Sequence, residues 1–217
     1  NTVQGFVIGS GLSYSKGFDE DYNSSLYTGV NFNYGTSDER LRYDGRISYR
    51  FNRINRRTIS LAGGTQVNQI NSSNPISGLE NTISSLFFER NFAKFYELDF
   101  ARFSYSEEVK DGFFLNGSIG YEQRQPLENT TAQVWFTQSD VDYTFNNPLL
   151  LDQNRLGFIQ EHELLKVSAG LTIKPGQKYQ SYPDQKFNIT NEKYPTIRLA
   201  YEGGFAASED NYNFHQI

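Results

Sequence analysis

The sequence predicts an all-β protein: an antiparallel up-and-down transmembrane β-barrel with one short loop helix. Residues 1–217 would form a single barrel domain or part of a larger barrel. The first indication is a series of segments, about ten residues each, in which apolar and polar residues alternate. The second is the aromatic content of 16%, almost all of it Phe and Tyr. The third is that no run approaches the ~20 apolar residues of a membrane helix.

The composition narrows the possible functions. The chain has 217 residues, 20 basic and 25 acidic, and a net charge of −5, whereas nucleic-acid-binding domains usually show a basic excess. We therefore expect no nucleic-acid partner. Cysteine is absent, which excludes disulfides and thiolate metal sites, and we expect no cofactor. Methionine is also absent, so we expect an interior or trimmed segment of a longer protein.

Residues 40–51 show the alternation most clearly. Successive side chains of a β-strand point to opposite faces, so this segment has an apolar, aromatic face and a charged face. We expect the first face to contact lipid and comprise Leu41, Tyr43, Gly45, Ile47, Tyr49 and Phe51. We expect the second to line the lumen, with Arg40, Arg42, Asp44, Arg46 and Arg50 as its charged residues.

The same period of two appears on both sides of this segment. Residues 5–14, 26–34 and 58–69 alternate in the same way and are joined to it by connections rich in polar residues. Four consecutive alternating segments are typical of an antiparallel meander. Further strands are predicted at 95–107, 113–123, 131–136 (with the only Trp, Trp135), 162–174 and 196–205, which gives eight or nine in all. The further lipid-facing residues predicted are Phe32, Tyr34, Phe113, Leu115, Ile119 and Tyr121.

Residues 95–107 have an irregular phase. Tyr96, Leu98 and Phe100 share one parity, whereas Phe103 and Tyr105 share the other. A β-bulge near Ala101 or Arg102 would reconcile them, so we predict one there. Asp111-Gly112 then indicates a tight hairpin.

One helix is predicted between the strands. Ser77 and Glu80 match a capping box, in which each side chain binds a free amide at the helix start. Leu79, Ile83, Leu86, Phe87 and Arg90 follow at helical spacing. The helix is either a plug or gating element or a loop helix packed on the barrel rim, and we favour the second interpretation.

The charged side chains allow two interpretations of the lumen. The arginines of residues 40–51 could line a pore that favours anions, as rings of charged residues do in channels. Alternatively, they form a salt-bridged network that fills a closed lumen, which we favour.

Glu161-His162-Glu163 suggests a metal or acid–base site, but strand alternation turns His162 away from both neighbours. His162 and Ser168 could form a Ser-His pair on the barrel wall, as in a phospholipase-type barrel, but we do not favour this arrangement. We expect no metal-binding or catalytic residue, and we expect that the protein is not an enzyme.

Residues 174–194 are predicted to form a long polar loop that mixes basic and aromatic side chains. Such a loop could bind polysaccharide, lipid head groups or a partner protein, or simply place aromatic rings at a membrane interface. The candidate partner residues are Lys178, Tyr179, Tyr182, Lys186 and Tyr194. The tail 206–217 is polar and is expected to begin a further loop.

Several short sequence motifs occur together in a characteristic order. They are Asn1-Thr2-Val3-Gln4-Gly5-Phe6, Phe145-Asn146-Asn147-Pro148, Glu161-His162-Glu163, Lys174-Pro175-Gly176-Gln177-Lys178-Tyr179, Tyr182-Pro183-Asp184, Lys193-Tyr194-Pro195 and Tyr201-Glu202-Gly203-Gly204. The ordered set resembles the barrel domain of unknown function that follows a carboxypeptidase-regulatory-like domain in outer-membrane proteins of Bacteroidota. The resemblance implies an upstream immunoglobulin-like periplasmic domain, not present in this chain, and an integral outer-membrane location. It brings no established active site.

Three functions remain open. The first is a non-enzymatic outer-membrane component of envelope assembly or transport, in contact with outer-membrane lipid and with other outer-membrane or periplasmic proteins. The second is a pore or export channel with an Arg-lined lumen. The third is a soluble antiparallel β-protein that binds carbohydrate. The third predicts aromatic rings in a dry core, whereas the first two predict them outside, in a band about 25 Å tall.

Overall fold

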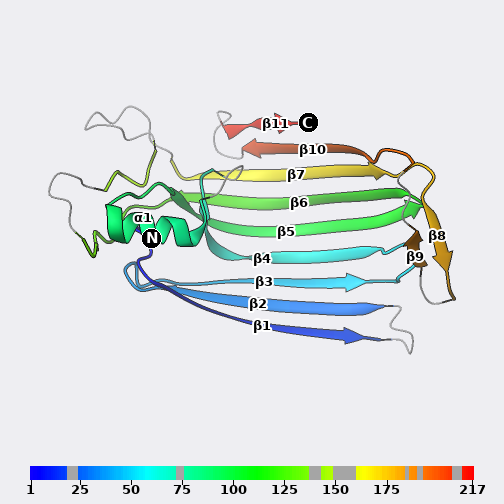
Figure 1. Cartoon of the computed structure of the whole chain (residues 1–217), viewed down its shortest axis with the longest axis horizontal. Coiled ribbons are helices and arrows are strands. Elements are labelled where there is room, and N and C mark those ends of the chain that lie inside the picture. The colour runs from blue at the N-terminus through cyan, green and yellow to red at the C-terminus, as the bar shows by residue number, and fades with distance from the viewer. Residues whose placement is uncertain are drawn as a thin grey trace.

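The computed structural model describes residues 1–18, 24–71, 76–136, 143–148, 160–183, 186–189, 193–206 and 212–217. They form one large antiparallel sheet, a small two-stranded sheet and one helix (Figure 1). The large sheet comprises β1 (Val7–Gly17), β2 (Ser25–Gly35), β3 (Leu41–Arg50), β4 (Thr58–Gln69), β5 (Phe95–Lys110), β6 (Phe113–Pro126), β7 (His162–Ile173), β10 (Ile197–Ala206) and β11 (Phe214–Gln216). The other elements are α1 (Gly78–Phe88), β8 (Lys178–Ser181) and β9 (Lys186–Ile189).

The large sheet is the predicted meander. Its order is β1-β2-β3-β4-β5-β6-β7-β10-β11, and every neighbouring pair is antiparallel. All of its strands except β11 have at least ten residues, enough to cross a bilayer at a tilt. The predicted all-β antiparallel class with one short helix is therefore confirmed.

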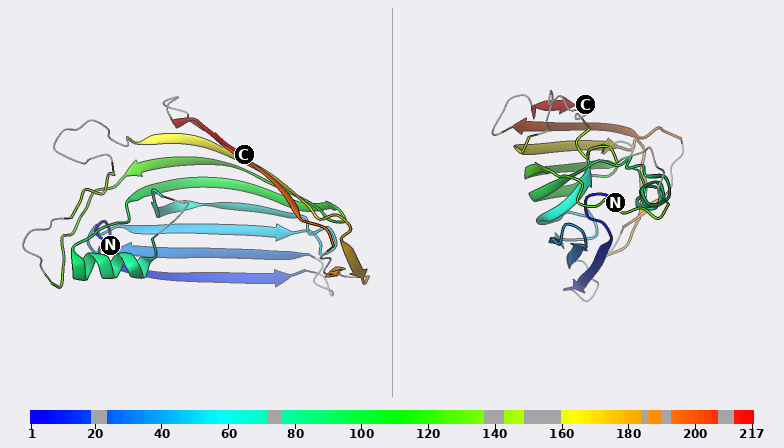
Figure 2. Two further views of the ribbon diagram at one scale, coloured as in Figure 1. Left: turned by 45° about the horizontal axis from the view of Figure 1, so that its top comes forward. Right: turned by 90° about the vertical axis from the view of Figure 1, so that its left-hand side faces the viewer.

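The sheet is curved and open. Seen from its end, it forms an arc with the N-terminal segment and α1 on the concave side (Figure 2). Strands β1 and β11 are its two edges, so within the described residues the sheet does not close as the barrel prediction requires. Gly64 permits a change of direction in β4, because its φ of +141° is rarely adopted by other residues. The pairing of β3 with β4 ends at this glycine.

The bulge predicted near Ala101 and Arg102 is wrong. The pairing of β5 with β4 and with β6 runs without interruption through both residues, and the irregularity lies between Glu108 and Lys110. The phase irregularity has another cause: Tyr96 and Leu98 face inward, where they line a cavity of about 440 Å³. An inner face that is covered at this end tolerates apolar side chains.

Helix α1 begins as predicted. The Ser77 hydroxyl accepts a hydrogen bond from the Glu80 amide (3.1 Å), and the Glu80 carboxylate accepts one from the Ser77 amide (3.1 Å). The buried face of this helix is polar: Asn81 and Ser85 are buried, and the side-chain oxygen Oδ1 of Asn81 accepts a hydrogen bond from the Ala93 amide. Leu79, by contrast, is exposed.

Three further expectations need correction. Residues 131–136 do not form a strand; Trp135 instead packs edge-on against Phe87 of α1. The loop 174–194 contains the hairpin β8–β9. In the tail, the three residues of β11 pair with β10. Such strands are too short to show an alternation of apolar and polar residues in the sequence, because they form only by pairing with a partner strand.

We predict that Ser77→Ala loosens α1 by about 1 kcal/mol, because an amide at the helix start loses its acceptor. Hydrogen–deuterium exchange of residues 78–88 measures this, and their exchange should become faster. Thr82→Ala is the control, because its hydroxyl only bonds the Gly78 carbonyl within the helix. Equal exchange in the Ser77 variant and the parent protein would contradict the role of the cap.

Candidate functional site: the two faces of the curved sheet

The outer face of the sheet is apolar because the strands pair in phase. One cross-strand row consists of Ile47, Leu61, Phe103, Ile119 and Val167, contributed by β3 to β7 in turn. No charged residue occupies an outward position of β2, β3 or β10. We call this surface the outer apolar face. It includes all the predicted lipid-facing residues that lie in strands: Phe32, Tyr34, Leu41, Tyr43, Ile47, Tyr49, Phe113, Leu115, Ile119 and Tyr121.

The outer apolar face is exposed. Tyr43 is 59% exposed, Leu61 57% and Leu199 60%. Phe51, which follows β3, is also exposed and lies edge-on to Tyr49. Among the described residues only four hydrophobic side chains are buried: Val3, Ala93, Leu98 and Leu164. A sheet of this size normally buries one of its faces. In the described part of this chain, by contrast, most hydrophobic side chains are at least partly exposed.

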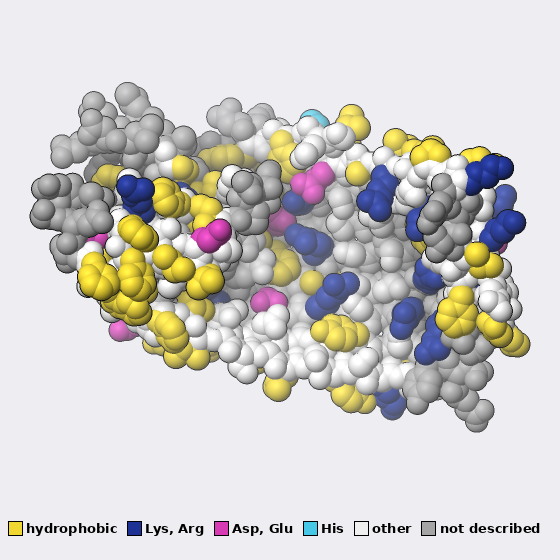
Figure 3. Space-filling model, in the orientation of Figure 1, with side chains coloured by type: hydrophobic (Ala, Val, Ile, Leu, Met, Phe, Trp, Pro, Cys, Tyr) yellow, Lys and Arg dark blue, Asp and Glu magenta, His cyan; other side chains and the backbone are white. Residues whose placement is uncertain are grey.

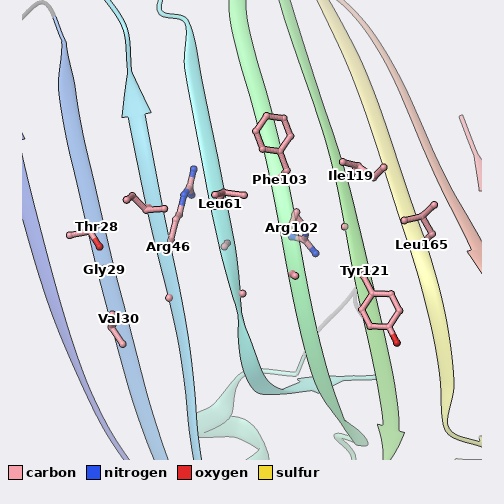
Figure 4. A pocket seen from close by; sticks show the side chains of 16 residues that line it. Thr28, Gly29, Val30, Arg46, Leu61, Arg102, Phe103, Ile119, Tyr121 and Leu165 are labelled. Atoms are coloured by element: carbon pink, nitrogen blue, oxygen red, sulfur yellow. The ribbon is translucent and has the colours of Figure 1, made fainter.

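A shallow depression marks the middle of the outer apolar face (Figure 4). It lies where Gly45, Gly63 and Ala101 are neighbours on three successive strands. Its sides are formed by larger residues, among them Val30, Leu61, Phe103, Ile119, Tyr121 and Leu165. The depression is lined by apolar surface for the most part, and it adds no reactive group to this face.

The inner face is polar and is organised in rows. Ser48, Ser60, Ser104, Ser118 and Ser168 are paired in register on β3 to β7 and form a serine row. The hydroxyls of Ser48 and Ser60 are 2.8 Å apart, and those of Ser118 and Ser168 are 2.7 Å apart. This row was missed from the sequence because its members come from five separate segments, and only the register brings them together.

A basic row runs next to the serine row. Arg46, Arg102 and Lys166 lie on alternate strands, and Ala62 and Gly120 lie between them. Small residues between the cations leave room for the long basic side chains. Two of the three cations are paired with carboxylates: Arg102 with Glu122 at 2.9 Å and Lys166 with Glu202 at 3.0 Å.

The predicted lumen arginines divide into two groups. Arg42 is 2% exposed and is held by Asp38 (2.7 Å) and Glu97 (2.6 Å). Arg40, which precedes β3, contacts the same Glu97 at 3.0 Å. Asp44 accepts a hydrogen bond from Asn31 at 3.0 Å.

The other two arginines bind hydroxyl groups. Arg46 donates to Ser48 and Ser60, and Arg50 donates to Ser25. The charged residues of segment 40–51 therefore form an ion-paired network at one end of β3 and a cationic surface at the other. Figure 3 looks onto the concave side and shows Lys and Arg side chains gathered toward the end that carries β8 and β9.

Two residues of the candidate partner loop point into the protein. The Tyr179 hydroxyl donates to the buried Glu108 and accepts from the Gly112 amide. Lys186 binds Glu108 (3.3 Å) and Asp111 (2.7 Å). Burial and the bond to Glu108 raise the pKa of Tyr179 to about 12. Of the remaining candidates, Lys178, Tyr182 and Tyr194 are exposed.

The His162 ring stacks on Tyr212 at 3.8 Å, and its Nδ1 contacts the Gln160 carbonyl. The Ser168 hydroxyl is bonded to Ser118 instead. No group of His, Asp and Glu in the described ranges could hold a metal ion.

No helix in the described part of the chain is long and apolar enough to cross a membrane.

We predict that Arg42→Met destabilises the protein by about 3 kcal/mol, because Asp38 and Glu97 would keep buried charges without their partner. Arg40→Met is the matched control: Arg40 also binds Glu97, but its side chain is 59% exposed, so the loss should stay below about 1 kcal/mol. Denaturant unfolding in detergent measures both variants. Equal losses of unfolding free energy in the two variants would show that the burial of Arg42 does not determine its contribution to stability.

Comparison with known proteins gives one match. Searches of curated proteins and of solved structures found nothing similar. The family model described as "Family of unknown function (DUF5686) C-terminal domain" matches residues 1–217. The match covers the whole chain, and it confirms the expected resemblance to a domain of unknown function. The chain therefore belongs to this family, as its C-terminal domain.

Proposed function

We propose that this chain forms part of the wall of an integral outer-membrane β-barrel. The protein serves, without enzymatic activity, in envelope assembly or transport together with partner proteins. The outer apolar face contacts lipid hydrocarbon, and the inner face lines a hydrated interior. Further strands, supplied outside the described residues, complete the wall. The resemblance described above supports a Bacteroidota origin and an upstream periplasmic domain.

One observation carries this proposal: among the described residues only four hydrophobic side chains are buried, and the curved sheet exposes its apolar face while its polar residues line the concave side. In water the outer apolar face would be a large exposed hydrophobic surface that promotes aggregation. In a bilayer it is the surface expected of a barrel wall, whose strands alternate apolar outside and polar inside. The soluble carbohydrate-binding alternative requires aromatic rings in a dry core, whereas Phe32 and Tyr43 are exposed.

Adjacent residues on opposite faces provide a direct test. The chain has no cysteine, so single spin labels can be placed by Ile47→Cys and Ile119→Cys outside and by Ser48→Cys and Ser118→Cys inside. In membranes, the outer labels should collide mainly with oxygen, which concentrates in hydrocarbon. The inner labels should collide mainly with a water-soluble nickel chelate. Electron paramagnetic resonance measures both collision rates.

The matched control is built into each pair, because Ile47 and Ser48 differ by one position along the same strand. If the outer labels were as accessible to the nickel chelate as the inner ones, the membrane assignment would be wrong. A label at Ile47 that neither reagent reaches would indicate a protein contact there instead of lipid.

An Arg-lined pore is the second candidate, and it is favoured by Arg46. This side chain is exposed on the inner face and bonds only to serine hydroxyls among its described neighbours. Its charge would thus be available to attract anions to the interior.

If the protein conducts ions, Arg46→Glu should shift the reversal potential toward cation selectivity in a planar bilayer under a salt gradient. Lys16→Glu is the control, because Lys16 occupies an outward position of β1. An unchanged reversal potential in the Arg46 variant, or no current from the parent protein, would exclude the Arg-lined pore and leave the assembly role.

A further inference from the structure

A second cationic site lies at the rim, outside the network around Arg42. A cavity of about 420 Å³ is lined by Arg50, Arg53, Arg56, Thr58 and Lys186. Arg50 ends β3, Thr58 begins β4, and the two other arginines lie in the turn between them. Lys186 comes from β9, more than a hundred residues further along the chain. We call this cavity the rim pocket. Of the five described residues that line it, four are basic and none is acidic.

The turn that carries the arginines is held in place by its own hydrogen bonds. The Asn55 amide binds the Asn52 side chain (2.9 Å), the Asn55 carbonyl accepts from the Glu108 amide (2.7 Å), and the Thr58 hydroxyl donates to the Arg56 carbonyl (3.0 Å). Arg56 adopts a φ of +54°, a left-handed conformation that is uncommon for residues other than glycine. The turn is therefore fixed before any ligand arrives, which lowers the entropic cost of binding.

The opposite wall of the rim pocket is fixed as well. Lys186 lies over the Tyr179 ring, 3.9 Å from its centroid, and binds Glu108 and Asp111. The Arg56 guanidinium donates to the Asn188 side chain of the same hairpin at 2.9 Å. These contacts hold the β8–β9 hairpin against the β3–β4 turn and keep the pocket between them.

The charge of the rim pocket is only partly compensated. Within the described ranges, Arg50 bonds to the Ser25 hydroxyl and Arg56 to the Asn188 amide, both of them neutral acceptors. Arg57, in the same turn, is paired differently: its guanidinium meets Glu107 at 2.9 Å. Guanidinium groups that share one cavity repel each other, and an anion placed between them would remove that repulsion.

We propose that the rim pocket binds a phosphoryl group, held by the forked guanidinium groups of Arg50, Arg53 and Arg56. Arginine presents planar pairs of N–H donors that match phosphate oxygens, and such charge-assisted bonds are stronger than neutral ones. Thr58 and Lys186 line the same cavity. The phosphoryl group comes either from a soluble phosphate compound or from a lipid head group. This site does not depend on the membrane assignment, since a soluble protein with the same pocket would bind the same group.

The test uses the full-length protein in a phosphate-free maltoside detergent. Inorganic pyrophosphate and dihexanoyl phosphatidic acid are titrated separately by calorimetry. Arg53→Gln with Arg56→Gln should weaken binding at least about tenfold, since two forked donors are lost. Arg53→Lys with Arg56→Lys keeps both charges but removes the fork, and should also weaken binding severalfold. Arg57→Gln is the matched control, because it removes one positive charge from the same turn and should change affinity less than about threefold.

The outcomes separate clearly. Pyrophosphate binding that both double variants weaken supports a soluble phosphate ligand. Binding of phosphatidic acid alone, weakened by the same variants, supports a lipid head group. No saturable binding of either probe overturns the proposal, as does an equal loss in the Arg57 variant, which would indicate a general charge effect. Lysine variants that bind like the parent protein also overturn it, and they are the less disruptive change should the glutamine variant fail to fold.

Discussion

The structure depends on the in-phase register of its meander. In each neighbouring pair of long strands, outward residues face outward residues, so that the two-residue period of one strand continues across the whole sheet. A slip of one residue in the pairing of β3 with β4 would place Ile47 beside an inward residue and divide the outer apolar face. Among the described residues few hydrophobic side chains are buried, so most apolar side chains of the sheet are at least partly exposed instead of forming a core of its own.

Most of the fold could be predicted because each long strand carries its own signal. Residues 58–69 show the alternation over the same bounds that β4 has in the structure, and the capping box locates the start of α1. The errors fall where the signal comes from elsewhere. Trp135 is placed by Phe87 of the helix, and β11 exists because β10 offers it an edge. The apolar inward residues of β5 imitate a bulge, because a covered inner face does not demand polar side chains.

The candidate site was predictable to the same degree. Parity alone places the predicted lipid-facing and lumen-facing residues on opposite faces of the sheet, but it cannot distinguish Arg42 from Arg46. That difference depends on Glu97, a residue 55 positions away from Arg42 in the chain. The serine row and the rim pocket are likewise made by register and by the placement of a hairpin. Single-sequence patterns contain neither kind of information.

The order of the strands has a consequence for how the sheet forms. Each strand of the large sheet pairs with the members that precede and follow it in the chain, with only β8–β9 inserted between β7 and β10. Most pairings therefore close short loops, which limits the entropy lost at each step and lowers the contact order. Growth can proceed hairpin by hairpin from an edge, and a hairpin gained or lost at β1 would leave every other register unchanged. The width of such a sheet can thus vary among related chains without redesign of its interior.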